Sequence, residues 1–495
     1  MQCVVINSED VVAVALQDLK KGSVVTTSAG EITLADDITR GHKFALRDIG
    51  EGEFIVKYGY PIGTATTPIR KGEHVHSHNV RTNLKGAGSY RYDRTEPCVL
   101  RRSEDRSFEG YLRADGQVGI RNEVWIIPTV FCVNHIAREL EAYAREKLMD
   151  YDHVDGCYAL THPYGCSQMG EDQTTTQKIL SCFSRHPNAG AVLVLGLGCE
   201  NNNIEVFKEF LDLKDDRLMF LNTQEVEDEL ETGFAVIDRL LDKANRCRRQ
   251  TVPLSKLRIG LKCGGSDGLS GITANPLIGR VSDLLVAAGG TSVMTEVPEM
   301  FGAEQILMNR AVSEDVFRQT VSLINDFKEY FRSHGETVSE NPSPGNKAGG
   351  ITTLEDKSLG CVQKGGKAEI NGVIRYGDTI RENGLNLLQA PGNDGVSCSA
   401  LAAAGCHLIL FSTGRGTPFS TVIPTIKIST NTALYEKKGG NWIDFNAGAV
   451  VDGANFDSLA DELLDYIVSI ASGESSVSEK RGFHEMLIWK DGVTM

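Results

Sequence analysis

The stretch LRIGLKCGGSDGLSGITANPLIGRVSDLLVAAGG, residues 257–290, decides the fold class of the chain. It opens with a short apolar run, passes through a glycine-rich loop, and continues with apolar residues spaced as on one face of a helix. A strand, a tight loop and a helix in this order form the repeating unit of a parallel sheet covered by helices. The stretch therefore predicts an α/β domain that begins near residue 256.

The same alternation extends in both directions from this stretch. Towards the C-terminus it continues through TSVMTEVPE (291–299) and CHLILFSTG (406–414), and towards the N-terminus through EVWIIPTVF (123–131) and AGAVLVLGLGCE (189–200). Each apolar run is a buried strand candidate that precedes a helical pattern, which favours mostly parallel sheets. We expect a middle α/β domain over residues 110–255 and a C-terminal α/β domain over residues 256–495.

Three segments depart from this alternation. Residues 1–88 show short β-type runs broken by Gly and Asp turns every eight to twelve residues, which predicts a small all-β module. Residues 89–109 are charged and aperiodic, as in a linker. Residues 340–396 are rich in Gly and polar residues with little regular pattern, and such a long segment inside a domain is usually functional or disordered.

Composition and charge exclude several classes of partner. The 495 residues carry 51 basic and 66 acidic side chains, and a net charge of −15 repels nucleic acid and anionic membranes. No apolar run approaches the roughly 20 residues of a membrane helix. The start MQCVVINSEDVV has acidic residues where a signal peptide has basic ones, and the twelve cysteines form no CxxC pair. We expect a cytoplasmic enzyme with reduced thiols and without nucleic-acid or membrane partners.

Polar motifs follow several of the predicted parallel strands, where ligands of such sheets bind. They are GLGCEN, CGGSDGLSG, TEVPE and STGRGTP. The first lacks the third glycine of a dinucleotide fingerprint, so we do not expect a nucleotide cofactor. In the second, Cys263, Ser266 and Asp267 could contact a metal or hydroxyl groups, unless the loop is an ordinary turn with a helix cap. Glu296 and Glu299 suit a metal or an acid/base pair, or else a solvated helix start.

The stretch GEHVHSHNVRTN, residues 72–83, places His74, His76 and His78 at alternate positions. On a strand these three imidazoles share one face, where they could bind a metal, contact a substrate or face water. The neighbouring motifs RGHKFAL and KYGYPIG add donors for a polyhydroxy acid, namely His42, Lys43 and Lys57. These donors favour substrate contact.

Together these motifs resemble a known family. RGHKFALRDI, KYGYPIG and GEHVHSHNVRTN are similar to the N-terminal β-clip (SAF) module of altronate and galactarate dehydratases. The resemblance continues along nearly the full chain, through DGQVGIRNEVWIIPTV, THPYGCSQMGED, HPNAGAVLVLGLGCENN, CGGSDGLSGITANP, TEVPEMFGAEQ, NPSPGNKAGGITTLEDKSLGC, GLNLLQAPGND and STGRGTP. The order and spacing of these blocks resemble the enzymes that act on altronate more closely than those that act on galactarate.

The resemblance implies an architecture and an activity. It implies a β-clip, a linker, a middle domain that forms a homodimer, and a C-terminal Rossmann-like domain with a metal site. The implied reaction removes water from D-altronate, a sugar acid of hexuronate catabolism, to give 2-dehydro-3-deoxy-D-gluconate. Galactarate dehydration, β-elimination on a related sulfo-acid, or binding of a sugar acid without turnover are the alternatives. The implied cofactor is Fe(II), in a mononuclear site or an iron–sulfur cluster, with Mn(II) as a substitute.

The resemblance does not fix residue roles, so several candidates stay open. The reaction needs a Lewis acid on the carboxylate, a base for the proton of carbon 2 and an acid for the hydroxyl of carbon 3. Candidates for catalysis are His74, His76, His78, Asp267, Glu296, Glu299 and His407. Candidates for substrate binding are His42, Lys43, Lys57, Lys262, Ser266, Lys347 and Arg415. A mononuclear ion would use Asp267, Glu296 and His407, and a cluster would use Cys166, Cys199 and Cys361. We expect the histidine-bearing module to close over the substrate as a lid, unless one histidine completes the iron shell.

Overall fold

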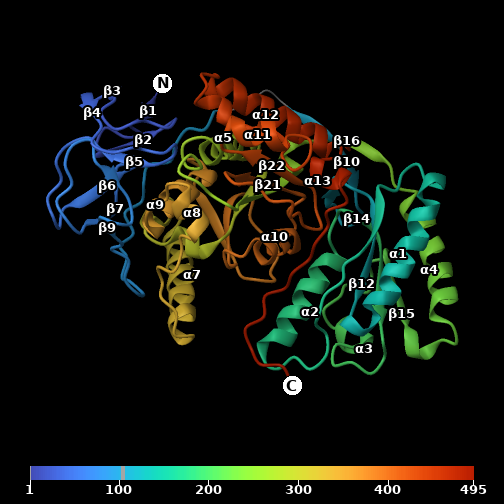
Figure 1. Ribbon diagram of the computed structural model, residues 1–495. Helices are drawn as coiled ribbons and strands as arrows, with labels where there is room; N and C mark the ends of the chain where they lie inside the picture. Colours follow the sequence, from blue (N-terminus) through green and yellow to red (C-terminus); the bar gives the residue numbers. More distant parts are fainter. Residues whose placement is uncertain (1, 102–105) are drawn as a thin grey trace.

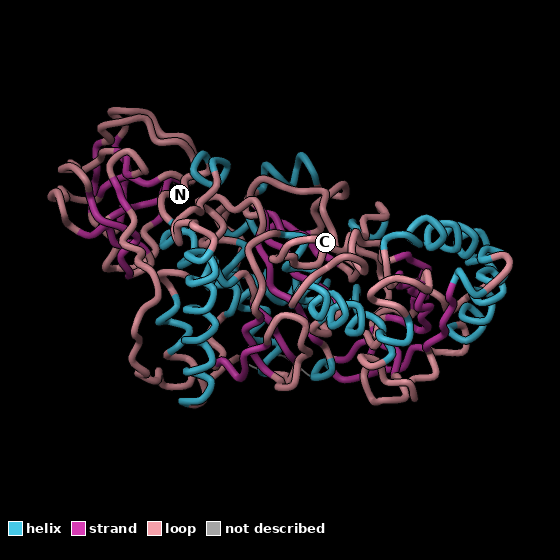
Figure 2. Tube along the Cα trace, turned by 90° about the horizontal axis from the view of Figure 1, so that it is seen from below, coloured by secondary structure: helices cyan, strands magenta, loops and turns pink. Residues whose placement is uncertain are grey.

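The chain folds into three consecutive parts, and the computed structural model describes residues 2–101 and 106–495. Figure 1 shows the all-β module on one side, the large parallel sheet with its helices in the centre, and the middle domain on the other side. Figure 2 shows the same row of three parts from below, with the strand-rich module at one end. This arrangement confirms the predicted α/β multidomain class with an N-terminal all-β module.

The N-terminal module is built from short antiparallel strands. One sheet has the order β1-β2-β5-β8, a hairpin pairs β3 with β4, and a third sheet has the order β6-β7-β9. The strands are β1 (Cys3–Val4), β2 (Val12–Ala15), β3 (Val24–Thr27), β4 (Gly30–Thr33), β5 (Lys43–Ala45), β6 (Phe54–Lys57), β7 (Tyr60–Ala65), β8 (His74–Val75) and β9 (Val80–Arg81). The predicted histidine strand is therefore only two residues long, and it places His74 opposite Phe44.

The segment after the module runs along the C-terminal domain. The Tyr90 hydroxyl donates to Glu304 at 2.7 Å, and the Tyr92 hydroxyl donates to the carbonyl of Ala311 at 2.6 Å. The predicted linker 89–109 ends earlier than expected, because β10 begins at Ser107. Residues 102–105 of that linker lie outside the described part of the chain.

The middle domain holds a parallel sheet of order β13-β12-β14-β15 and an antiparallel sheet of order β11-β10-β16. Helices α1 and α4 pack together against one face of the parallel sheet, and α2 covers the other. The elements are β10 (Ser107–Leu112), β11 (Val118–Gly119), β12 (Glu123–Pro128), η1 (Phe131–Val133), α1 (Asn134–Lys147), η2 (Leu148–Asp150), β13 (Gly156–Ala159), α2 (Glu171–Ser184), β14 (Ala189–Gly196), α3 (Ile204–Lys208), β15 (Leu218–Asn222), η3 (Thr223–Glu225), α4 (Glu229–Ala244) and β16 (Arg249–Pro253).

The C-terminal domain contains a seven-stranded parallel sheet of order β19-β20-β18-β17-β21-β22-β23. Its strands are β17 (Arg258–Cys263), β18 (Thr291–Met294), β19 (Ile370–Ile374), β20 (Gly384–Leu388), β21 (Leu408–Thr413), β22 (Thr425–Ser429) and β23 (Phe445–Asn446). The chain leaves β17 for β18 on one side and later adds β21 on the other. This change of direction is a topological switch point, beside which ligands of parallel sheets bind.

Helices surround this sheet and fill the segment that looked irregular in the sequence. They are η4 (Leu254–Lys256), α5 (Ala274–Ala287), η5 (Val297–Met300), α6 (Glu304–Met308), α7 (Glu314–Ser333), α8 (Pro344–Ala348), α9 (Leu354–Cys361), η6 (Val362–Gly365), α10 (Asp394–Ala403), α11 (Thr432–Lys438), η7 (Ala447–Val450), α12 (Phe456–Ala471) and α13 (Val477–Lys480). The Gly-rich segment 340–396 therefore contains α8, α9, β19 and β20, contrary to its aperiodic pattern.

The middle and C-terminal domains share a hydrophobic core. Trp125 of β12 and Phe183 of α2 belong to the same buried cluster as Leu401 of α10 and Phe411 of β21. Helices α2 and α10 pack against each other across this boundary. Among the residues described, no helix has the length and apolar character needed to cross a membrane.

Candidate functional site

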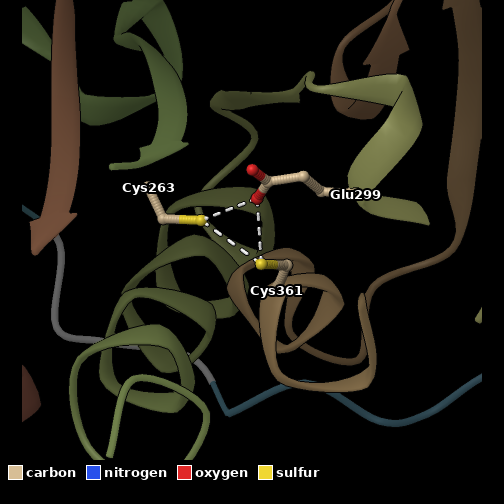
Figure 3. Close-up of side chains that lie close together, drawn as sticks. All are labelled: Cys263, Glu299 and Cys361. Carbon is tan, nitrogen blue, oxygen red and sulfur yellow. Dashed lines mark hydrogen bonds between the residues drawn. The ribbon is translucent and has the colours of Figure 1, made fainter. Parts of the chain in front are cut away.

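Three side chains meet at the carboxyl edge of the seven-stranded sheet. Cys263 is the last residue of β17, Glu299 lies in η5 just after β18, and Cys361 is the last residue of α9. Because β17 and β18 are parallel neighbours, their carboxyl ends open onto the same space. Figure 3 shows the three side chains pointing toward one another from these three segments.

The three side chains are in direct contact. The Cys263 and Cys361 thiols lie 3.2 Å and 3.0 Å from the same Glu299 oxygen, Oε2, and the two sulfur atoms lie 3.3 Å apart. Their exposed fractions are 1% for Cys263, 5% for Glu299 and 4% for Cys361. They form the one group of three or more Cys, His, Asp or Glu ligand atoms within 4.8 Å of one another among the residues described.

A charged cluster encloses this trio. Lys357 pairs with Glu299 at 2.8 Å, Lys364 pairs with Glu296 at 2.8 Å, and Lys262 pairs with Glu296. Glu296 also accepts the backbone N–H of Cys263 at 3.0 Å, and it has a left-handed φ of +67°, which is uncommon for a residue with a side chain. This strained backbone is maintained by the contacts of the Glu296 carboxylate.

The pKa values of two members of the trio are shifted in opposite directions. Burial would raise the pKa of Glu299, but the charges of Lys357 and Lys262 outweigh it and hold the pKa well below its usual value. The hydrogen bond with Cys263, together with burial, raises the pKa of the Cys361 thiol well above its usual value. Glu299 is therefore ionised at neutral pH, and the thiol of Cys361 remains protonated until a bound cation displaces its proton.

The trio fits a divalent metal ion of borderline softness. Two sulfur atoms and one carboxylate oxygen are donors that Fe(II) and Zn(II) accept. The surrounding charges fit as well. Lys262 pairs with Asp394 at 2.9 Å as well as with Glu296. Together with the pairs of Lys357 and Lys364, this gives three lysines balanced by three carboxylates. Two thiolates would then neutralise one divalent ion.

Two lysines predicted to bind substrate lie elsewhere, in the contact between the module and α9. Lys43 and Lys57 pair with Asp356 at 2.8 Å and 2.9 Å, and Lys43 also donates to the carbonyl of Gly350 at 2.7 Å. Burial lowers the pKa of Lys43 to about 8. Since both ammonium groups are buried in an ion pair, they hold the module on the C-terminal domain and do not face a substrate. This buried contact docks the module on the C-terminal domain.

The structure gathers the predicted histidines at the edge of the module. The ring of His74 lies 5.1 Å from His42, 5.5 Å from His76 and 5.3 Å from His78. His42 Nε2 lies 3.2 Å from the carbonyl oxygen of Ala348 and must donate to it, so His42 Nδ1 accepts from His74 Nε2 at 3.0 Å. Burial lowers the pKa of His74 to about 4 and that of His76 to about 3. His74 and His76 are therefore neutral near pH 7.

The histidine cluster and the trio are separated by the length of α9. His76 Nδ1 contacts the hydroxyl of Thr352 at 3.1 Å, just before the helix, and Cys361 ends the helix. Eight residues at 1.5 Å per residue span roughly 12 Å. The histidines are thus too distant to complete the coordination of an ion bound by the trio.

The glycine-rich loop after β17 carries two further candidates. Asp267 accepts hydrogen bonds from the hydroxyls of Ser270 at 3.0 Å and Thr430 at 2.9 Å. Its carboxylate therefore organises the loop and does not join the trio. Ser266 is buried, and its carbonyl accepts from Asn346 at 2.8 Å. Lys347 and Arg415 have exposed, cationic side chains at this edge, where an anionic substrate could meet them.

His407 lies at the opposite edge of the sheet, so the mononuclear set of Asp267, Glu296 and His407 is wrong. His407 precedes β21, and its Nδ1 accepts the backbone N–H of Arg258 at 3.2 Å, at the amino end of β17. Burial lowers its pKa well below the usual value. It lines a separate cavity of 340 Å³ there.

The predicted three-cysteine cluster is divided between two domains. Cys361 lies with Cys263 in the C-terminal domain, whereas Cys166 and Cys199 follow strands β13 and β14 of the middle sheet. Cys166 contacts Asn201 at 3.4 Å, and Cys199 contacts Gln224 at 3.4 Å. Cys361 therefore does not join these two thiols.

Sequence reasoning missed three charged residues of the cluster, Lys357, Lys364 and Asp394. One signal was present in LEDKSLGCVQKGG, where two lysines lie four residues before and three residues after Cys361. Side chains at these spacings share a helix face, which predicts that both flank the thiol. Asp394 and Lys262, which form an ion pair, are 132 residues apart in the sequence, so no local sequence pattern predicts their contact.

Three family models match consecutive parts of the chain. They are the "Altronate/galactarate dehydratase SAF domain" at residues 1–83, the "D-galactarate dehydratase/Altronate hydrolase, second domain" at residues 110–245, and the "D-galactarate/Altronate dehydratase, C-terminal" at residues 254–494. The chain thus belongs to the altronate/galactarate dehydratase family, as the motifs predicted.

Individual relatives place the chain within this family. It is 50% identical over 496 residues to the altronate dehydratase of Escherichia coli K12, with 100% of both chains covered. It is 52% identical over 493 residues to the altronate dehydratase of Bacillus subtilis 168, with 99% of both covered. The galactarate dehydratase (L-threo-forming) of E. coli K12 is 33% identical over 504 residues, which cover 97% of this chain and 95% of the relative.

Proposed function

We propose that the protein dehydrates D-altronate to 2-dehydro-3-deoxy-D-gluconate and water, as a step of hexuronate catabolism. The observation that carries this proposal is the identity of 50% and 52% with two altronate dehydratases over essentially the whole chain, against 33% with a galactarate dehydratase. The proton of carbon 2 and the hydroxyl of carbon 3 leave as water, and the resulting enol tautomerises to the keto acid.

We assign the metal of this reaction to the trio of Cys263, Glu299 and Cys361, and we assign Fe(II) as the ion. The burial of the trio and its balanced charges support this assignment. When bound, the ion supplies a Lewis acid for the substrate carboxylate and the neighbouring hydroxyl. The ammonium of Lys262 is held by Glu296 and Asp394 and provides a fixed positive charge beside the same space.

Asp394 is the member of the charged cluster that a substrate can reach. Its side chain is 37% exposed, whereas those of Lys262 and Glu296 are buried. Gly264 permits its approach, because a Cβ at that position would lie 2.8 Å from the Asp394 carboxylate oxygens. We assign Asp394 as the group that accepts the proton of carbon 2. Lys347 and Arg415 at the exposed rim bind the anionic substrate from outside.

We infer a homodimer formed through the middle domain and a cytoplasmic location, on the strength of the family resemblance for the first and of the reduced thiols for the second. All twelve cysteines are free.

The test of the function is an anaerobic assay with two substrates. The protein is reconstituted with Fe(II) and a thiol reductant, incubated with D-altronate or galactarate, and assayed for a 2-keto-3-deoxy acid. We expect product from D-altronate with a kcat/KM at least about tenfold above that for galactarate, a preference of about 1.4 kcal/mol. No product from D-altronate with folded, iron-loaded protein would refute the proposal.

The residue assignments are tested with matched variants. Asp394→Asn should retain iron and lose at least about a hundredfold in kcat, which is the lower end of a general base contribution. Cys361→Ser should lose the iron of the trio. Lys256→Ala, an exposed residue at the opposite edge of the sheet, is the control and should keep both properties. Normal turnover by Asp394→Asn would remove that residue from the mechanism.

A further inference from the structure

Three cysteines outside the proposed metal site lie at one edge of the middle sheet. Cys132 lies in η1 just after β12, Cys166 in the loop after β13, and Cys199 in the loop after β14. The sheet order β13-β12-β14 makes these three strands direct neighbours, and all three are parallel. Three thiols therefore follow three adjacent strands at their carboxyl ends, where parallel sheets bind ligands.

Hydrogen bonds tie the three loops together. The backbone N–H of Phe131 donates to the carbonyl of Tyr164 at 2.9 Å, and that of Asn202 donates to the carbonyl of Gly165 at 3.1 Å. The approach is so close at Gly165 that a Cβ there would lie 2.0 Å from the carbonyl oxygen of Thr129. The loops that carry Cys132, Cys166 and Cys199 are thus held as one unit.

The thiols of this unit are accessible, two of them accept a hydrogen bond, and Cys166 also donates one to Asn201 Oδ1 at 3.4 Å. Cys132 and Cys199 are exposed and Cys166 is half-buried. The amide of Gln224 donates to the sulfur of Cys199 at 3.4 Å, and the hydroxyl of Ser167 donates to the sulfur of Cys166 at 3.9 Å. Donors aimed at sulfur stabilise thiolates that bind metal clusters.

Two buried polar side chains lie in the same loops as Cys166 and Cys199 and also point to a ligand. Asn202 is fully buried, and its amide nitrogen donates to the carbonyl of Thr129 at 3.0 Å, but its Oδ1 has no partner among the described residues. Gln168 accepts the N–H of Gly165 at 3.3 Å, and its buried Nε2 likewise has no partner within the part of the chain that the structure describes. Buried polar groups are nearly always satisfied, by protein, water or a bound group.

We propose that Cys132, Cys166 and Cys199 hold an iron–sulfur cluster, a site that goes beyond the proposed function and is separate from the trio of the C-terminal domain. Ligands of a single ion would all lie within 4.8 Å of one another, and among the described residues only the trio meets that limit. The three thiols are therefore too far apart to bind one ion. Thiolates that bind different irons of one cluster lie farther apart. Three thiolates leave one iron of a four-iron cluster without a cysteine, open to an oxygen ligand.

The experiment measures cluster content and does not depend on turnover. The full-length protein is reconstituted anaerobically with Fe(II), sulfide and a thiol reductant, and is then desalted. Iron, acid-labile sulfide and visible absorption are measured per chain. We expect acid-labile sulfide and a broad visible absorption band in the wild type. In the triple variant Cys132→Ser/Cys166→Ser/Cys199→Ser, sulfide should fall at least about tenfold, since even outer-shell partners of a metal site are worth that much.

Controls separate this site from the trio. Cys98→Ser removes an exposed thiol elsewhere and should keep full sulfide, and Cys361→Ser should lose only the iron of the trio while keeping the sulfide. If the triple variant does not fold, the three single variants replace it, and each should lose most of the sulfide. Wild-type protein without acid-labile sulfide, or a folded triple variant that retains it, would overturn the proposal. The proposal would also be overturned if the wild type bound iron without sulfide and the triple variant lost that iron, because this result indicates single iron ions.

Discussion

The substitution Asp356→Asn should release the N-terminal module from the C-terminal domain. The Asp356 carboxylate pairs with Lys43 at 2.8 Å and Lys57 at 2.9 Å, and it also accepts the backbone N–H of Thr352 at 2.9 Å. All three charged side chains are at most 2% exposed. An asparagine keeps the shape but offers one acceptor oxygen in place of two, so at least one lysine loses its hydrogen bond and both buried lysines lose their counter-charge.

The size of the effect follows from this burial. Removing one member of a buried ion pair costs about 3–5 kcal/mol, because the remaining charge stays buried and unpaired. A loss of about 4 kcal/mol corresponds to roughly a thousandfold change in the docking equilibrium. Replacing Lys43, Lys57 and Asp356 together with apolar residues of similar size should restore most of this loss, since it removes the uncompensated charges.

Hydrogen exchange reports docking directly, because opening of the module exposes its strands without unfolding the rest of the chain. Backbone amides of β5 and β7 should exchange roughly a hundredfold to a thousandfold faster in Asp356→Asn. The control Asp37→Asn breaks an ion pair with Lys20 that is 62% and 80% exposed, and it should change exchange by less than about fivefold. Unchanged exchange in Asp356→Asn would refute the role of this ion pair.

The pH dependence of docking gives an independent check. The pKa of Lys43 is lowered from 10.5 to about 8 in the folded protein, chiefly by burial. Between these values the undocked state binds more protons than the docked state, so the stability contributed by this group rises with pH. Protection of β5 should therefore increase between pH 8 and pH 10 in the wild type.

Three further predictions concern the metal and the histidines. Glu299→Gln should lower iron affinity by at least about tenfold, which dialysis against a chelator measures, whereas His407→Asn should leave the iron content unchanged. His74→Ala, His76→Ala and His78→Ala, made singly, should each retain iron, because no histidine of the described residues joins the trio and α9, roughly 12 Å long, separates His76 from it; loss of iron in any of them would make histidines ligands. The pKa values of about 4 for His74 and about 3 for His76 keep these imidazoles neutral near pH 7. If kcat/KM falls with an apparent pKa near 6.5, that apparent pKa should be the same in His74→Ala and His76→Ala as in the wild type. A change of that apparent pKa in either variant would contradict the neutral state.

The sequence was sufficient for the fold class and for the edge of the sheet that carries the site. Strand, glycine loop and helix follow one another in 257–290, and parallel topology then places Cys263 and the segment of Glu299 at one edge. The assignment of His407 to the metal site is wrong, and the position of His407 in the sequence indicates why. It precedes the strand HLILF, so it belongs at the amino edge, away from residues that follow their strands.

Other parts of the site depended on contacts over long sequence distances. The thiols of Cys263 and Cys361 meet across 98 residues, and Asp356 meets Lys43 across 313. A lysine in a strand usually faces water, so RGHKFAL gave no sign that Lys43 is buried. Only the position of Asp356 in the fold makes that burial tolerable, and no local pattern encodes it.

Helix α9 connects the module with the proposed metal site. Asp356 and Lys357 are consecutive, so their side chains leave the helix about 100° apart and serve different neighbours. Asp356 binds the module, while Lys357 pairs with Glu299 at 2.8 Å and Cys361 ends the same helix as a member of the trio. A helix of eight residues is too short to be stable without its packing partners. The docked module therefore supports the helix that positions one thiol of the trio and the lysine that pairs with Glu299.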